Sequence, residues 1–283
     1  MADAEEWIEW DVARARDWIA VPRSDDDKYS RGVLGVITGS HDYPGAAVLG
    51  VEAAMRTGVG MVRYTGPRAV AGAVLARRPE VVTISGRVQA WLLGSGMNPA
   101  RRTLVLSGEL SQAIGEGHPI VLDAGALDLV GETHGAAVIT PHYRELAALL
   151  GGRKGPTVEE VAENPGEWAI RAAEALGATV LLKGAVTHIA QPDGIRLTVS
   201  SSPGWLATAG TGDVLGGVLG ALLATHHEVL KYDPSKLAPL SATAALLHGL
   251  AARRASGGGP IAALDVAQAI PATIAALLAR SEG

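Results

Sequence analysis

The sequence contains no cysteine and no phenylalanine, and aromatic residues make up only 4% of its 283 residues. Without thiols the chain can form no disulfide framework, thiolate nucleophile, cysteine-ligated zinc site or iron–sulfur cluster. At this length folding buries roughly 75% of the surface of the unfolded chain, so a stable core needs no covalent cross-links. Any catalysis must therefore use oxygen, nitrogen or backbone groups.

A surplus of basic residues and long uncharged apolar runs are also missing. The 24 Lys and Arg residues stand against 29 Asp and Glu residues, for a formal net charge of −5, and this is not the charge pattern of a protein that binds nucleic acid or anionic lipid. No uncharged apolar run reaches the ~18 residues of a membrane span, and the acidic N-terminal stretch has no signal-peptide-like apolar segment. We expect a cytoplasmic protein that acts on small molecules, with no nucleic-acid or membrane partner.

Short apolar runs alternate with helical stretches along most of the chain. This alternation predicts a mostly parallel sheet with helices on both faces. The strands are expected at residues 33–37, 60–64, 81–84, 91–93, 120–122, 137–139 and 180–182. Helices are expected at residues 45–57, 143–150, 167–176, 214–224, 241–251 and 265–279. A Gln-Pro-Asp-Gly turn between residues 186–190 and 195–199 predicts an antiparallel hairpin.

The first 31 residues differ in character from the rest. A helix is expected over residues 5–20, and Pro22 and the following acidic run indicate an exposed linker. No internal repeat or low-complexity segment divides the remaining chain. We therefore expect residues 1–283 to form a single domain, with residues 1–31 as a leader helix and linker.

The strongest local motif is a glycine-rich turn that opens a helix, Ala209-Gly210-Thr211-Gly212-Asp213. The first amides of a helix lack intrahelical acceptors and lie at the positive end of its dipole, so Gly210, Thr211 and Gly212 form a candidate anion hole for a phosphate. Asp213 then has two possible roles. It could be a general base for phosphoryl transfer, or it could only cap the helix, which is the commoner role for an isolated motif of this kind.

Other polar residues follow expected strands. Lys183 could contact a phosphate or be merely solvated. His142 could contact a ligand or lie on the surface at the start of a helix whose expected N-cap is Thr140. Asp123 could help to hold a cation, although capping a helix is the expected role. The run His226-His227-Glu228 lacks the i, i+4 spacing of a metal site and is expected to end a helix.

Taken in order, several blocks resemble the ADP-dependent (S)-NAD(P)H-hydrate dehydratases of the ribokinase-like superfamily. The blocks are TGSHDYPGAA, GSG, LDAGALDL, TPHYREL, LLKGA and LATAGTGDVLGG. The resemblance runs from about Gly32 to the C-terminal helix. It implies an α/β three-layer sandwich with a mostly parallel central sheet, ADP as co-substrate, Mg²⁺ as cofactor and a homo-oligomer, commonly a tetramer.

The same resemblance assigns residues to two ligands. The hydrated dinucleotide is expected to contact Ala46, Gly96, His142 and Asp213, with Asp213 as the catalytic residue. ADP is expected to contact Lys183, Gly184, Ala185, Val186, Thr187 and Gly212. The resemblance assigns no metal ligands. The sequence departs from the family pattern at Ala209, where glycine is usual, at Gly125, where Asp is usual, and at residues 94–98, where the family has Gly-Pro-Gly-Leu-Gly.

The implied activity is the ADP-dependent dehydration of the S epimer of hydrated NADH or NADPH, which restores NAD(P)H and yields AMP and phosphate. Asp213 would deprotonate the ring hydroxyl, which then attacks the β-phosphate of ADP, because phosphate is a better leaving group than hydroxide. An ATP-dependent kinase of a vitamin precursor or sugar would share the anion site and the base, and a non-catalytic nucleotide sensor would share the fold. The motifs leave open the choices between ADP and ATP and between hydrated NADH and NADPH.

Overall fold

The computed structural model describes residues 7–151 and 155–279 and is built around a nine-stranded sheet with the order β1-β9-β8-β7-β6-β5-β4-β2-β3. The strands are β1 (Ile8–Glu9), β2 (Val33–Ile37), β3 (Met61–Tyr64), β4 (Ala90–Leu93), β5 (Ile120–Leu122), β6 (Ala137–Ile139), β7 (Thr179–Leu182), β8 (Thr187–Ala190) and β9 (Arg196–Val199). From β7 to β3 all neighbouring strands are parallel. Their carboxyl ends therefore meet at one edge of the sheet.

The expected hairpin is confirmed as β8 and β9, which pair antiparallel, and β8 is also antiparallel to β7. The strand expected at 81–84 is wrong. Only Val82 bridges to Arg63 of β3, and the side chain of Ile84 is 69% exposed. The chain bends at Ile84, two residues after this single bridge, so the apolar run adds no strand to the sheet.

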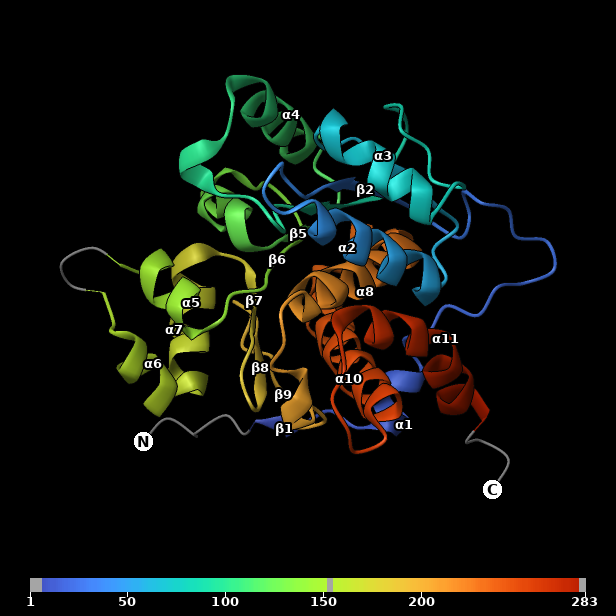
Figure 1. Cartoon of the computed structure of the whole chain (residues 1–283). Coiled ribbons are helices and arrows are strands. Elements are labelled where there is room, and N and C mark those ends of the chain that lie inside the picture. Colours follow the sequence, from blue (N-terminus) through green and yellow to red (C-terminus); the bar gives the residue numbers. More distant parts are fainter. Residues whose placement is uncertain (1–6, 152–154, 280–283) are drawn as a thin grey trace.

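Helices cover both faces of the sheet, which confirms the three-layer α/β architecture (Figure 1). One layer contains α1 (Val12–Arg16), α2 (Pro44–Thr57), α3 (Arg68–Arg77), α8 (Thr211–Thr225), α9 (His227–Tyr232), α10 (Leu237–Ser256) and α11 (Ala263–Ala279). The other contains α4 (Leu104–Gly115), α5 (Tyr143–Leu149), α6 (Val158–Glu163) and α7 (Pro165–Leu176). Within the described residues, no helix is long and apolar enough to cross a membrane.

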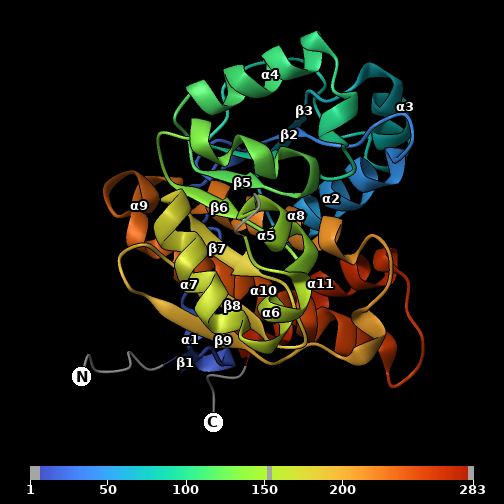
Figure 2. The ribbon, with the colours of Figure 1, turned by 90° about the vertical axis from the view of Figure 1, so that its left-hand side faces the viewer.

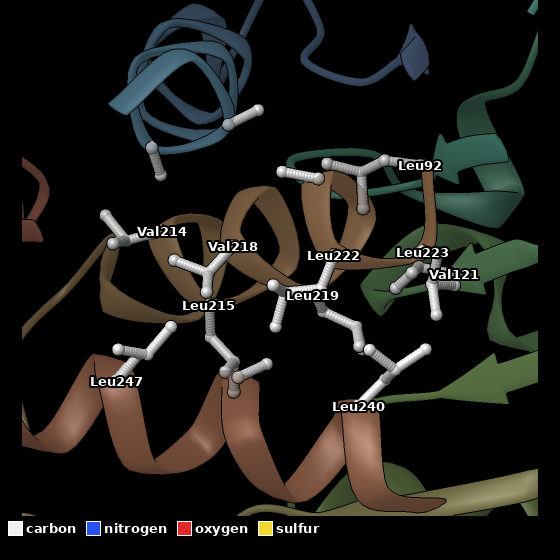
Figure 3. Packing of buried hydrophobic residues seen from close by; sticks show 14 of the residues in the cluster. Leu92, Val121, Val214, Leu215, Val218, Leu219, Leu222, Leu223, Leu240 and Leu247 are labelled. Atoms are coloured by element: carbon white, nitrogen blue, oxygen red, sulfur yellow. The ribbon is translucent and has the colours of Figure 1, made fainter. Parts of the chain in front are cut away.

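Alternate side chains of the strands enter two separate cores. In β2, Leu34 and Val36 pack under the α8 layer, whereas Val33 and Ile37 pack under the α4 layer, as the two-residue period of a strand dictates. Figure 3 shows the first core, where Leu215 and Leu219 of α8 lie above α10. Burial on both faces explains why these strands are apolar throughout.

The position of α8 depends on a close approach to α2. A Cβ atom at Gly217 would collide with the carbonyl oxygen of Gly50, so only glycine lets the two helix backbones come this near. The contact holds the N-terminus of α8 at the carboxyl edge of the sheet. The glycine-rich turn is thereby placed beside the ends of β4 to β7.

The leader helix expected over residues 5–20 is wrong in extent, and residues 1–6 lie outside the described part of the chain. Among residues 7–20, only Val12–Arg16 is α-helical, and Ile8–Glu9 instead pairs with β9 as a parallel edge strand. Trp10 is buried, and its Nε1 donates to Thr243 Oγ1 at 3.1 Å. Figures 1 and 2 both place β1 next to β9. The segment covers an edge that would otherwise be open to solvent, and this favours pairing over a helix.

Candidate active site

Charged side chains from distant parts of the chain meet at the carboxyl edge of the sheet. Lys183, directly after β7, places its Nζ atom 3.1 Å from Asp123 Oδ1, which follows β5. The same Nζ lies 3.8 Å from Glu145 Oε2 in α5. Asp213, in the first turn of α8, interacts electrostatically with both Asp123 and Lys183. Ligands of open α/β sheets bind at this edge.

Asp123 organises the cluster from a buried position. Its carboxylate accepts hydrogen bonds from Ser95 Oγ at 2.9 Å, from Thr140 Oγ1 at 2.8 Å and from Lys183 Nζ. It does not cap the 3₁₀ segment Ala124–Glu132 that follows it, so the capping role expected from the sequence is wrong. Both carboxylate oxygens are instead engaged in fixing Lys183 and the loop after β4.

The N-terminus of α8 has no side-chain cap. Gly210 occupies the N-cap position in the left-handed conformation, at φ +89°, which glycine adopts without strain. The Thr211 hydroxyl donates backward to the carbonyl oxygens of Leu206 and Thr208, at 3.0 and 2.9 Å. Asp213 is the third helical residue and forms no cap, so the structural role considered for it is wrong. The first amides of α8 are left without a side-chain acceptor, as an anion site requires.

The pKa of Asp213 is raised to about 7, chiefly by burial and also by the negative charge of Asp123, while Lys183 acts in the opposite direction. A carboxylate is ordinarily a weak base at neutral pH. A general base works best when its pKa lies near the operating pH. A carboxyl group whose pKa is shifted in this way by burial and by neighbouring charges is therefore a candidate for proton transfer.

Lys183 is held as a cation and is not simply solvated. Burial, the largest influence, lowers its pKa, but the negative charges of Asp123 and Glu145 outweigh burial and keep the pKa above its usual value. A Cβ atom at Gly212 would lie 3.6 Å from Lys183 Nζ. The ammonium group and the uncapped amides of α8 therefore border the same space, which suits a phosphate.

A cavity of about 470 Å³ opens beside Lys183. Of the nucleotide contacts expected from the sequence, the structure places Lys183, Gly184, Ala185, Thr187 and Gly212 in its wall. Val186 is not among the lining residues, and its side chain is 36% exposed. The remaining described lining residues are Ser202, Pro203, Gly204, Leu206, Ala207, Thr211, Leu215 and His248.

His248 is a wall residue that the sequence analysis missed. It is buried within α10, and burial lowers its pKa to about 4, so the imidazole is neutral. No sequence signal marked it, because a single histidine among the apolar residues of a helix is typical of a core position. Its place in the cavity wall depends on how α10 packs against the Thr211 turn.

His142 caps α5, in place of the expected Thr140. Its Nδ1 accepts from the Glu145 amide at 3.1 Å, and Glu145 Oε2 accepts from the His142 amide at 2.7 Å. This reciprocal pair is a capping box. Because Nδ1 is an acceptor, the neutral ring carries its proton on Nε2. The side chain is 52% exposed, so that N–H can donate to a ligand. Glu145 was also missed, although its spacing of three residues from His142 is the signal of this motif.

Ala46 and Gly96 lie against one another at the end of β4. Gly96 has φ +69°, and a Cβ atom there would collide with the Ala46 side chain. The neighbouring Ser95 bonds to Asp123. The expected dinucleotide residues and the expected phosphate residues are thus joined through the Ser95–Asp123–Lys183 chain of contacts.

Comparison with solved structures first gives the class of protein: the chain is an α/β protein with the ribokinase-like fold. An Enterococcus faecalis protein of the ribokinase-like superfamily superposes with a TM-score of 0.81 at 22% identity, over 96% of each chain. The family model for NAD(P)H-hydrate dehydratase matches residues 34–271. The chain belongs to this family.

Individual relatives agree with that assignment. An ADP-dependent (S)-NAD(P)H-hydrate dehydratase from Neisseria meningitidis is 35% identical over 247 residues, covering 81% of this chain and 78% of its own. The bifunctional NAD(P)H-hydrate repair enzyme Nnr from Corynebacterium glutamicum is 36% identical over 90% of this chain, but this chain spans only 49% of that enzyme. The ADP/ATP-dependent NAD(P)H-hydrate dehydratase from Bacillus subtilis superposes with a TM-score of 0.84 at 25% identity, over 97% of this chain and 100% of its own.

Proposed function

We propose that this chain dehydrates the S epimer of hydrated NADH and NADPH at the expense of ADP, which restores NAD(P)H and releases AMP and phosphate. The observation that carries the proposal is Asp213. Its pKa of about 7 makes it a base at neutral pH, and it stands beside the uncapped amides of α8 and the Lys183 ammonium group. Family membership supports the same activity.

The reaction proceeds in two stages. Asp213 accepts the proton of the ring hydroxyl, the hydroxyl oxygen forms a bond to the β-phosphorus of ADP, and the bond from that phosphorus to the bridging oxygen breaks to release AMP. The lone pair of the ring nitrogen then expels phosphate with the C–O electron pair. A proton leaves the adjacent ring carbon, and the double bond of the reduced nicotinamide is restored.

Each predicted site residue has a role in this scheme. The amides of Gly210, Thr211 and Gly212 and the Lys183 ammonium stabilise the negative charge on the transferred phosphoryl group. Gly184, Ala185, Val186 and Thr187, which follow Lys183, complete the nucleotide contacts. The ring binds against Ala46 and Gly96, where the absence of large side chains brings the backbone close. His142 Nε2 donates a hydrogen bond to the dinucleotide.

In this proposal Mg²⁺ binds together with the nucleotide and not at a site made of protein side chains. Among the described residues, no group of three or more His, Asp or Glu side chains could hold a metal ion, and the oxygens of Asp123 are already occupied. The side chains therefore do not fit a protein-only metal site. We expect Mg²⁺ to arrive bound to the phosphates of ADP, as is common for this ion.

The test is to incubate the protein with hydrated NADH and either ADP or ATP and to follow the return of reduced-nicotinamide absorbance. Asp213→Asn should lower turnover by ~10²–10⁴-fold while ADP binding is retained. Asp25→Asn, whose side chain is 72% exposed, is the matched control and should behave like the wild type. Wild-type turnover in Asp213→Asn would refute the assigned base, and accumulation of a stable phosphorylated acceptor would identify a kinase instead.

We further propose that residues 1–283 act as one catalytic domain, in the cytoplasm, as a homo-oligomer and specifically a tetramer. Exposed apolar residues support the oligomer: Leu104 and Val105 at the start of α4 are 92% and 72% exposed.

The proposed location in the cytoplasm rests on the proposed substrates, since adenine nucleotides and reduced dinucleotides are metabolites of the cell interior. Sedimentation at micromolar concentration tests the subunit number, and a single monomeric species would refute the tetramer.

A further inference from the structure

A second cavity, of about 460 Å³, lies farther along the same edge of the sheet. Its walls are the loops that follow β2, β3 and β4 and the first turns of α4. It adjoins the proposed ring site directly, because Tyr43 lies three residues before Ala46 and Met97 follows Gly96. Nothing in the proposed chemistry so far uses this cavity.

The order of the strands places the two cavities on opposite sides of the reacting groups. The cavity beside Lys183 and Gly184 lies toward β7 and β8, and the second cavity lies toward β2 and β3. Neighbouring strands are ~4.8 Å apart, so three steps from β5 to β3 span roughly 14 Å. With ADP in the first cavity, the second cavity gives the nucleotide attached to the hydrated ring room to extend in the other direction along this edge.

The walls of the second cavity combine apolar and cationic groups. Tyr43, which is 62% exposed, Pro67, Met97 and Leu106 provide apolar surface on which a planar base can stack. Of its arginines, Arg101 pairs with Asp42 and Arg102 pairs with Asp128.

Arg68 differs from these two arginines. It lines the cavity, its side chain is exposed, and within the described residues it has no hydrogen-bond or ion-pair partner. A guanidinium group without a partner matches a phosphate in geometry and in charge.

We propose that this cavity holds the adenosine half of the hydrated dinucleotide and that Arg68 binds the phosphate carried by its ribose, so that hydrated NADPH is preferred over hydrated NADH. The proposal rests on the proposed dehydratase function for the identity of the dinucleotide. It adds a subsite and a specificity residue to that function. No chemical step takes place in this cavity.

The kinetic test compares Arg68→Ala with Arg254→Ala, which removes an exposed arginine of α10, at saturating ADP. Arg68→Ala should lower kcat/KM for hydrated NADPH by ~10- to 100-fold through KM, the range for a hydrogen bond to a charged group, and change the value for hydrated NADH by less than about threefold. Arg254→Ala should change neither. Equal losses with both substrates, or no loss with hydrated NADPH, would overturn the role of Arg68.

A second variant and a binding measurement separate this proposal from the dehydratase activity. Tyr43→Ala should raise KM for both hydrated dinucleotides alike, because it removes stacking surface and no charge. An unchanged KM would overturn the cavity assignment.

Calorimetry with adenosine 2′,5′-bisphosphate, with ADP already bound, should show binding to the wild type and an affinity at least tenfold lower in Arg68→Ala. If the wild type lacks turnover, the proposed function fails, but the calorimetry still tests the cavity assignment. Equal affinity of the wild type and of Arg68→Ala for adenosine 2′,5′-bisphosphate would reject that assignment.

Discussion

The pKa of Asp213 is the property of a single residue on which the proposed chemistry depends most directly. Because this pKa is about 7, about half of the Asp213 side chains carry the required negative charge at neutral pH. Lys183 keeps its positive charge through this range because its pKa lies above its ordinary value. We predict that kcat/KM for the hydrated dinucleotide rises about tenfold per pH unit up to about pH 7 and is level above it. A profile that is flat between pH 5 and 8 would contradict the assignment of Asp213 as base.

The neighbouring Asp123 provides a second test of the same pKa. Its negative charge raises the pKa of Asp213, after the larger effect of burial. Asp123→Asn removes this like charge and leaves the attraction of Lys183, so the acidic limb of the pH profile should move to lower pH. Asp25→Asn again serves as the control. An unmoved limb in Asp123→Asn would show that the two carboxylates do not interact.

The sequence motif identified Asp213 and Lys183 but could not reveal their environment. The pKa of the Asp213 carboxyl group is raised by burial and then by the nearby Asp123, and Asp123 is held in its buried position by hydrogen bonds from Ser95, Thr140 and Lys183. Ser95 and Lys183 are 88 positions apart in the chain, and only the parallel sheet brings them together. Local propensity assigned Asp123 a capping role because it cannot anticipate partners from other strands.

At the scale of the helix, His142 has a structural and a functional role that can be separated. As N-cap of α5 it accepts the Glu145 amide, which Asn can also do, whereas Ala cannot. His142→Ala should lose about 1 kcal/mol of unfolding free energy in urea, and His142→Asn much less. Both variants should raise KM for the hydrated dinucleotide, because both lack the Nε2 donor. Full activity in His142→Asn would limit this residue to capping.

The packing of α8 against α2 offers a matched pair of glycines. Gly217→Ala should destabilise the protein by about 1–3 kcal/mol, since the added methyl group meets the Gly50 carbonyl and must push the helices apart. Gly108→Ala, in α4, meets no atom within 4 Å and should stabilise by about 0.4–1 kcal/mol. Urea unfolding measures both. Equal effects would mean that the close approach does not limit the position of α8.

The pattern of apolar runs predicted the architecture of the whole molecule better than it predicted the edge strands of the sheet. Central strands such as β2 and β7 are apolar on both faces, so a short run is enough to identify them. Edge segments lack this signal. Residues 8–9 look helical by local spacing, yet they pair with β9, and residues 81–84 look like a strand, yet they leave the sheet after one bridge. Tertiary pairing decides such segments, and the sequence alone does not show it.

The N-terminal segment provides the test of whether residues 1–31 belong to the domain. Trp10 and Ala15 are buried in the main core, and β1 covers β9. Replacing a buried Trp by Ala costs about 3–5 kcal/mol, and 1 kcal/mol corresponds to about 2–4 °C for a protein near this size. We therefore predict that Trp10→Ala, and a chain that starts at Gly32, both lower the Tm measured by calorimetry by roughly 10 °C. Tyr232→Ala, at a side chain that is 78% exposed, should leave Tm within about 1 °C. An unchanged Tm in the shortened chain would instead show that the segment is a leader independent of the core.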